Sequence, residues 1–320
     1  MSLFEVKNYT LQCGVTLPSV QVAYKTYGRL KGDNVIVYPS WFTGFIEDNE
    51  WLIGDALDAK KYFIIVVCAL GNGQSTSPSN TAGPFPDISL YDNVMLQHKL
   101  VTEVFHIRKI KLVVGWSMGA QQTYQWACLF PEMIENIAPI CGSAKTAPHN
   151  FVFLEGVKAA LEGGKNEASG LRAAARVYAG WGFSQPFYRK ECWRKLGFST
   201  LEDFLTGFWD AFFLKRKRAN VLAMLNTWQY ADISANAIFK GDIRRALRSI
   251  VARTLVMPAE RDLYFPVADS AWEVDHINRR KTGLNATLLV IPGVWGHFAA
   301  DGLNPKDTKF INAALHHLLL

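Results

Sequence analysis

The sequence predicts an α/β fold with a mostly parallel central sheet, helices on both faces and an inserted helical lid. Three observations support this prediction. Short apolar, β-rich runs alternate with helical stretches along most of the 320 residues, as expected for strands that are buried on both faces. One of these runs leads directly into a serine that is flanked by glycines. The segment 149–234 interrupts the alternation, because it is helical and rich in aromatic residues.

The predicted strands are rich in Val, Ile and Leu and alternate with amphipathic stretches, which is the pattern of βαβ units. They lie at 20–24, 34–38, 63–67, 112–115, 137–140, 254–257 and 287–291. Residues 90–104 predict one of the intervening helices. Residues 307–320 repeat apolar side chains at helical spacing, so we expect a last helix that packs on the sheet.

The pentapeptide Gly-Trp-Ser-Met-Gly at 115–119 directly follows an apolar strand and precedes a helical stretch. A serine at the apex of such a strand–turn–helix is the nucleophile elbow of the α/β-hydrolase fold. The turn is sharp and strained, so small residues must flank the serine, and Gly115 and Gly119 supply them. The motif therefore predicts the α/β-hydrolase fold, with Ser117 as the nucleophile.

The aromatic, helical segment predicts the domain organisation. We expect residues 1–148 and 235–320 to form the core domain, and residues 149–234 to form a helical lid subdomain. A lid of this composition would shape an apolar pocket above the serine and exclude water from it.

A serine hydroxyl needs an imidazole base, and the base needs a carboxylate that holds its tautomer. In this fold the carboxylate follows a late strand and the histidine follows the last one. Asp262 lies in the loop after the strand at 254–257, and His297 follows the final strand in a Gly-His pair. We predict these two residues as the acid and the base, with Glu260 and Asp269 as alternatives for the carboxylate.

Acyl transfer also requires two N–H donors for the oxyanion of the tetrahedral intermediate. One is expected from the backbone of Met118, the residue after the nucleophile. The other is expected from the loop that follows the strand at 34–38. Within this loop we predict the N–H of Phe42, with Trp41 as the alternative.

The amino-acid composition argues against several classes of function, namely nucleic-acid binding, metal binding and membrane association. The net charge of +6 arises from basic residues in short separate runs such as 215–218, which predict solvated surface; no nucleic-acid-binding motif accompanies them. The five cysteines are scattered without metal-site spacing, so we expect no metal and no cofactor. With no apolar run long enough for a bilayer and no secretion signal, we expect a cytoplasmic enzyme that has neither a membrane nor a nucleic acid as partner.

Over nearly its whole length the chain resembles the homoserine O-acetyltransferase family. The resemblance rests on core stretches and lid stretches at 42–44, 70–79, 85–89, 91–94, 115–122, 126–127, 170–176, 204–205 and 215–225. It implies Ser117, Asp262 and His297 as a catalytic triad that works through an acyl-enzyme in a ping-pong mechanism. Members of the family often dimerise through their lid helices, so the resemblance also allows a homodimer.

Several positions depart from the family's pattern. Trp116 and Ala120 replace glycines beside the nucleophile. Phe298 stands where the family has an aspartate for the amine of the acceptor, and Ser184 stands where it has an arginine for the carboxylate. A site that lacks partners for buried charges discriminates strongly against a charged ligand. We therefore expect an acceptor other than homoserine.

The expected pocket is aromatic and neutral. It consists of Trp41, Trp116, Trp181, Phe183, Ser184, Trp295 and Phe298. These residues predict a serine hydrolase that cleaves an ester or thioester of a fairly apolar small molecule. The alternative is an O-acyltransferase that uses acetyl-CoA or another acyl donor and an alcohol that is not an amino acid.

Overall fold

A computed structural model describes residues 1–279 and 285–320, and an eight-stranded sheet lies at its centre. The strand order is β1-β2-β4-β3-β5-β6-β7-β8. The strands from β3 to β8 are parallel, whereas β1 and β2 join antiparallel at one edge. The bounds are β1 (Ser2–Thr10), β2 (Thr16–Tyr27), β3 (Val35–Pro39), β4 (Phe63–Val67), β5 (Ile110–Trp116), β6 (Ile134–Ile140), β7 (Arg253–Val256) and β8 (Ala286–Leu288).

The predicted α/β-hydrolase fold with a mostly parallel sheet is confirmed. β3 and β4 are buried at every residue, because apolar layers cover both faces of the sheet. Successive side chains of a strand point to opposite faces. In β3 the side chains of Ile36 and Tyr38 therefore join one hydrophobic core, and those of Val35 and Val37 join the other.

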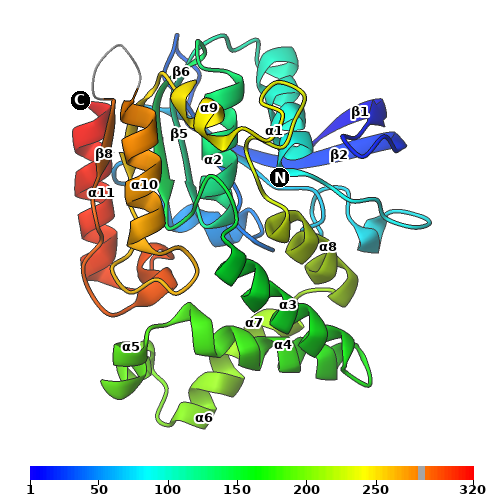
Figure 1. Cartoon of the computed structure of the whole chain (residues 1–320), viewed down its shortest axis with the longest axis vertical. Coiled ribbons are helices and arrows are strands. Elements are labelled where there is room, and N and C mark those ends of the chain that lie inside the picture. The colour runs from blue at the N-terminus through cyan, green and yellow to red at the C-terminus, as the bar shows by residue number, and fades with distance from the viewer. Residues whose placement is uncertain (280–284) are drawn as a thin grey trace.

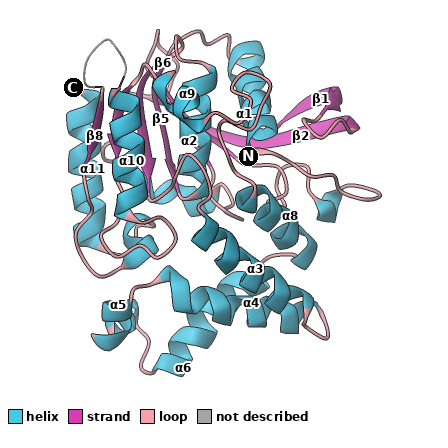
Figure 2. Ribbon diagram, viewed as in Figure 1, coloured by secondary structure: helices cyan, strands magenta, loops and turns pink. Residues whose placement is uncertain are grey.

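Helices lie on both faces of the sheet (Figures 1 and 2). One core includes side chains of α1 (Leu90–Lys99), α2 (Met118–Leu129), α9 (Ile243–Arg248) and α10 (Val267–Asn278). The other includes side chains of α11 (Pro305–Leu319). Within residues 1–279 and 285–320, no helix combines the length and the apolar character needed to span a membrane. Short 3-10 and π-helical turns occupy Glu47–Leu52, Pro78–Asn80, Leu100–Val104, Cys192–Leu196, Leu205–Asp210 and Gly296–Ala300.

Between β6 and β7 the chain leaves the sheet and forms a helical insertion, which Figure 1 shows as a separate group at the bottom of the view. Its helices are α3 (Pro148–Glu162), α4 (Glu167–Gly182), α5 (Gln185–Arg189), α6 (Leu201–Phe204), α7 (Ala211–Leu214) and α8 (Arg218–Gln229). α9 follows in the sequence but packs against α2 and α10 of the core. The division of the chain into a core and a lid at 149–234 stays a prediction.

The two segments that connect the helical insertion to the core lie side by side. Lys145 and Asp232 form an isolated antiparallel bridge, and their side chains make an ion pair of 2.8 Å. The N–H of Thr146 donates to the carbonyl of Ala231 at 2.9 Å. The segments that enter and leave the insertion are therefore held together where they meet the core.

Glu273 of α10 has a buried carboxyl group that contacts one of these connecting segments. One carboxyl oxygen accepts the N–H of Ala144 at 2.6 Å, and the other accepts the hydroxyl of Tyr124 at 2.8 Å. Burial, which penalises the charged form, raises the pKa of Glu273 from 4.5 to about 8, although both hydrogen bonds act in the opposite direction. The folded chain therefore keeps this side chain protonated at a pH at which the unfolded chain has lost the proton.

We predict that Glu273→Gln weakens the pH dependence of stability. The pKa of Glu273 is raised on folding, so the folded chain binds more protons than the unfolded chain between the two values. The free energy of unfolding of the wild type then falls as the pH rises through this window, by at most about 1.4 kcal/mol per pH unit. Urea unfolding across the window should show the variant gaining stability relative to the wild type. For the exposed control Glu132→Gln, we expect the plot of unfolding free energy against pH to stay parallel to that of the wild type. The same parallel behaviour in Glu273→Gln would contradict the prediction.

The prediction that the basic run 215–218 is solvated is wrong for Arg216, whose side chain is buried. Its guanidinium forms an ion pair of 2.6 Å with Asp48 and lies over the rings of Phe45 and Phe212. A charged side chain is seldom buried unless it is paired, and the partner here comes from a distant part of the sequence. Lys215 and Lys217 are exposed as expected.

Candidate active site

Ser117 occupies the turn between β5 and α2, with φ 59° and ψ −124°. This conformation is costly for a residue other than glycine, and it persists only where the surrounding structure enforces it. Here the N–H of Ser117 donates to the carbonyl of Ile140 at 2.9 Å, and the Ser117 carbonyl accepts the N–H of Ala120 at 2.9 Å. The side chain is held at the carboxyl end of the parallel strands and is only 3% exposed.

Two glycines make this turn sterically possible. A Cβ on Gly115 would lie 2.3 Å from the carbonyl oxygen of Gly119, and a Cβ on Gly119 would lie 2.5 Å from the carbonyl oxygen of Pro39. Gly142, beyond β6, is equally tight, because its Cβ would lie 2.6 Å from the Ser117 carbonyl oxygen. The backbone segments around the serine therefore touch one another directly.

His297 and Asp262 meet although 35 residues separate them. The Nδ1 atom of His297 lies 2.7 Å from an Asp262 carboxylate oxygen, and both side chains are almost fully buried. The other Asp262 oxygen accepts the N–H groups of Tyr264 at 2.7 Å and Phe265 at 3.1 Å. The carboxylate is thus fixed by its own loop and orients the imidazole.

The two alternative carboxylates have other surroundings. Glu260 is about half exposed and pairs with Arg261 at 3.0 Å. Asp269 lies in the first turn of α10. In the part of the chain that the structure describes, Asp262 is the carboxylate that is hydrogen-bonded to His297.

His297 lies beside the serine turn. Its ring centroid is 5.1 Å from that of Trp116, the residue directly before Ser117. The loop that carries His297 packs tightly on the helical insertion, because a Cβ on Gly296 would lie 2.9 Å from the backbone nitrogen of Ser184. Gly296 also has a positive φ of 62°, so this Gly-His pair needs its glycine for both reasons.

The loop after β3 approaches the serine turn at Pro39 and then bends sharply at Thr43, which has φ 56°. The bend is closed by the N–H of Gly44, which donates to the carbonyl of Trp41 at 2.9 Å. Among the described residues, the backbone N–H groups of Phe42 and Met118 have no hydrogen-bond partner. They are the donors predicted for an oxyanion.

A second loop, which the sequence presented only as a family-like motif, supports this bend. Asn72 donates to the carbonyl of Gly44 at 2.9 Å, and its own oxygen accepts the N–H groups of Gln74 and Ser75. Gln74 in turn accepts the N–H of Ile46 at 2.8 Å. The motif therefore holds the loop that carries Phe42 in place, a role that its spacing alone does not reveal.

Four of the predicted pocket residues form a continuous aromatic cluster beside His297. The ring of Trp116 lies 5.1 Å from that of Trp41 and 5.7 Å from that of Phe298. Phe298 stacks on Phe183 of the helical insertion at 4.6 Å. The cluster therefore extends from Trp116, the residue before Ser117, to the helical insertion.

The other three predicted pocket residues have different surroundings. Trp295 packs against Phe183 and Phe187 of the insertion. Trp181 contacts Phe153 and His149 instead. The hydroxyl of Ser184 accepts the N–H of Phe187 at the start of α5 and donates to the carbonyl of Val294. Its hydrogen bonds are thus used to join the insertion to the loop of His297.

Two tyrosines beside the site were not predicted. Tyr178 of α4 stacks on Phe42 with centroids 5.8 Å apart, and the ring of Tyr264 lies 4.7 Å from that of His297. Burial raises the pKa of both phenols well above the usual value, and the charge of Asp262 adds to this. Both side chains therefore stay protonated and neutral. Tyr178 lies within α4 and Tyr264 lies in the loop after β7, and no motif in the sequence marks either of them.

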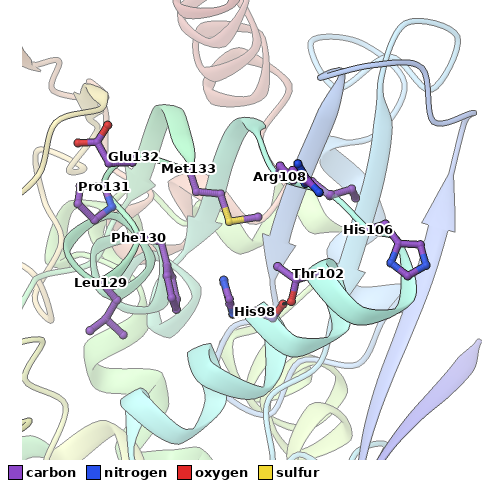
Figure 3. Close-up of a pocket in the computed structure, with 10 residues that line it drawn as sticks. His98, Thr102, His106, Arg108, Leu129, Phe130, Pro131, Glu132 and Met133 are labelled. Atoms are coloured by element: carbon purple, nitrogen blue, oxygen red, sulfur yellow. Dashed lines mark hydrogen bonds between the residues drawn. The ribbon is translucent and has the colours of Figure 1, made fainter.

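A cavity of about 700 Å³ lies elsewhere (Figure 3). It is lined by residues that precede β5 and β6, including Arg108 and Met133, and by His98, whose ring stacks on Phe130 at 3.9 Å. Ser117 follows β5 at the opposite, carboxyl end of the parallel strands. The residues that line this cavity include none of the predicted site residues. The described residues also contain no group of three or more His, Cys, Asp or Glu side chains able to hold a metal ion.

Comparison with known proteins shows the family to which this fold belongs. The family described as "alpha/beta hydrolase fold" matches residues 34–301. A probable esterase of Corynebacterium glutamicum is 37% identical over 96% of this chain and 92% of its own length. An ethyl acetate hydrolase of Pseudomonas veronii is 34% identical over 99% of this chain and 95% of its own length.

A solved structure and a more distant group of relatives extend the comparison. The structure of an acetylester hydrolase from Corynebacterium glutamicum has a TM-score of 0.92 at 34% identity, covering 99% of this chain and 96% of that one. A homoserine O-acetyltransferase of Chlorobium chlorochromatii is 35% identical over 45% of both chains, which confirms the resemblance found in the motifs. This chain is therefore an enzyme of the α/β-hydrolase family, related to esterases and to homoserine O-acetyltransferases.

Proposed function

We propose that this enzyme is a serine esterase that hydrolyses small uncharged esters, with acetate esters as its substrates. The observation that carries the proposal is the buried His297–Asp262 hydrogen bond of 2.7 Å beside the strained turn of Ser117. A nucleophile, a base and a carboxylate that orients the base are the parts of a hydrolytic triad. Related proteins named as an esterase, an ethyl acetate hydrolase and an acetylester hydrolase support the same activity.

In the first half of the proposed mechanism, the hydroxyl oxygen of Ser117 attacks the ester carbonyl carbon while its proton passes to Nε2 of His297. Asp262 accepts the Nδ1–H of the imidazole and stabilises its charged form. The carbonyl oxygen becomes an oxyanion that the N–H groups of Phe42 and Met118 bind. The intermediate then collapses: the bond to the alcohol oxygen breaks, and His297 gives its proton to the departing alcohol.

In the second half, water replaces the alcohol. It attacks the acyl carbon of the ester on Ser117, and its proton passes to His297. The same N–H groups bind the second oxyanion. When the bond to the serine oxygen breaks, His297 returns the proton to Ser117, and the carboxylic acid leaves. In the overall reaction, one ester and one water molecule give one alcohol and one carboxylic acid.

The choice of a small, neutral ester rests on the surroundings of the serine. Ser117 and His297 are each 3% exposed, and the rings of Trp116 and Phe298 lie directly beside them. Such a site favours an uncharged ester, since apolar walls offer no partner for a charge, and the names of the related proteins favour a short, acetyl group. The position that would bind an amine carries Phe298, and the hydrogen bonds of Ser184 are already used within the protein. A zwitterionic acceptor would leave its charges unpaired here, which is costly.

Intact-mass spectrometry tests hydrolysis against transfer. The protein is mixed with p-nitrophenyl acetate and, separately, with acetyl-CoA, and the decay of the acetyl adduct is followed with and without homoserine or simple alcohols. We expect an adduct from the ester that decays at one rate whatever alcohol is added. If an alcohol accelerates the decay and becomes acetylated, the enzyme is an O-acyltransferase, the activity that its homoserine O-acetyltransferase relatives would favour.

A further inference from the structure

Arg216 is the buried cation of the helical insertion. It lies between α7 and α8, and its side chain is 3% exposed. The guanidinium lies 3.9 Å from the centroid of the Phe45 ring and 4.8 Å from that of Phe212. Its Nη2 donates to a carboxylate oxygen of Asp48 at 2.6 Å. A planar guanidinium held between two rings and a carboxylate has one orientation, so this side chain makes a rigid contact.

The partner of Arg216 belongs to the loop that carries Phe42. The Asp48 oxygen that accepts the guanidinium also accepts the N–H of Phe45 at 2.9 Å. This hydrogen bond holds the backbone at Phe45, two residues after Thr43. The φ of Thr43, 56°, is strained for a residue with a side chain. The ion pair therefore joins the helical insertion to the bend that aims the N–H of Phe42.

A row of rings makes a second connection. Phe212, which covers the guanidinium, stacks on Trp41 at 5.8 Å. Trp41 lies 5.1 Å from Trp116, and Trp116 lies 5.1 Å from His297. Trp41 directly precedes Phe42. The guanidinium thus fixes the segment 41–48 from both of its ends.

We propose that Arg216 is a positioning residue for the oxyanion-binding loop. It ties the helical insertion to Asp48 and to the ring of Phe212, and so holds the strained bend at Thr43 in the conformation that presents the N–H of Phe42. A strained backbone persists only where several contacts determine it together, and the Asp48 pair is the ion pair that the insertion adds to its ring contacts with Trp41 and Phe42. This inference rests on the proposed esterase mechanism, because it assigns Arg216 to the oxyanion site of that mechanism.

The test compares Arg216→Met with Arg176→Met. Arg176 of α4 pairs with Asp210 at 2.8 Å inside the insertion and does not touch the segment 41–48, so its loss reports structural damage alone. The readouts are kcat, KM and the affinity for 1,1,1-trifluoroacetone. The carbonyl carbon of this ketone bonds to the oxygen of Ser117, and its own oxygen becomes the oxyanion.

For Arg216→Met we expect kcat for p-nitrophenyl acetate to fall about tenfold with little change in KM, and the affinity for trifluoroacetone to fall by the same factor. This is less than the loss that follows removal of an oxyanion donor itself, which is about 10²- to 10³-fold. Asp48→Asn should act in the same direction, and the double variant should lose no more than the larger single loss. The Asp48 side chain is 35% exposed, and an asparagine oxygen can still accept from the guanidinium. Because this variant leaves the buried charge of Arg216 without its carboxylate, thermal unfolding must show that it is folded, and the double variant, which carries neither charge, is the check.

Two outcomes overturn the inference. One is an affinity for trifluoroacetone that falls no more in Arg216→Met than in Arg176→Met. The other is additive losses in the double variant, which would show that Arg216 and Asp48 act separately. Failure of the proposed mechanism is distinguishable. Without Ser117 as nucleophile the wild type would form no adduct with the ketone, and transfer in place of hydrolysis would appear as faster decay of the acetyl adduct when an alcohol is added. If the wild type forms the adduct and the variants bind the ketone as tightly as the wild type does, the inference about Arg216 is wrong and the esterase proposal is unaffected.

Discussion

Ser117→Ala is expected to lower kcat for p-nitrophenyl acetate by a factor on the order of 10⁴ to 10⁶, and to abolish the acetyl adduct in intact-mass spectra. Removal of a catalytic serine leaves only the catalysis supplied by the oxyanion donors and by substrate binding. The substitution removes a single oxygen atom from a side chain that is 3% exposed. The thermal unfolding midpoint should therefore change little, which separates loss of chemistry from loss of structure.

Ser143 offers a matched control. It is also a buried serine after a parallel strand, and its hydroxyl donates to the carbonyl of Lys145 at 2.8 Å. Ser143→Ala should keep kcat and the adduct, with at most a small loss of stability from the missing hydrogen bond. Turnover that survives in Ser117→Ala, or that disappears equally in both variants, would contradict Ser117 as the nucleophile.

The second large effect is expected for Asp262→Asn, with kcat lower by about 10⁴-fold. The asparagine oxygen can still accept the N–H groups of Tyr264 and Phe265, which now bind the aspartate, so the loop should keep its shape. The amide cannot stabilise a charged imidazole, and it favours the wrong tautomer of His297. Steady-state kinetics, with circular dichroism as a check of folding, measures the effect.

Glu260→Gln and Asp269→Asn are the controls for this variant, because the sequence left both residues as alternatives. Glu260 is paired with Arg261, and Asp269 begins α10. Each replacement should leave kcat within about threefold of the wild type, since surface changes away from the site have small effects. A loss of 10³-fold or more in either control, with Asp262→Asn active, would assign the carboxylate to the other residue.

The local features of the site were predictable because each depends on a few neighbouring residues. A strand, a glycine, a serine and a helix in succession specify the elbow at Ser117, and a Cβ at Gly115 or Gly119 would indeed clash with backbone. The β-rich runs separated by helical stretches specify a parallel sheet covered on both faces. Chain order then places the candidate base after the last strand, as in other members of the fold.

The pairings between distant segments could not be predicted. Glu260, Asp262 and Asp269 lie within ten residues of one another, so spacing cannot tell which carboxylate meets His297. All three carboxylates follow β7, whereas His297 follows β8, and only the assembled sheet brings the carboxylate of Asp262 within 2.7 Å of the His297 ring. Trp181 belongs to the same aromatic segment as Phe183, yet it packs on Phe153, because neighbouring residues of a helix face different directions.

Arg216 shows most clearly the difference between what the sequence predicts and what the tertiary structure decides. In the sequence it is one of four consecutive basic residues, and such a run is ordinarily solvated. In the structure it is buried against Asp48, which lies 168 residues away. By itself, the sequence determined the fold, the serine elbow and the aromatic character of the inserted helical segment, because these follow from local order and composition. The tertiary structure alone decided which carboxylate, which rings and which arginine surround the elbow, because those contacts form only when loops from different strands meet.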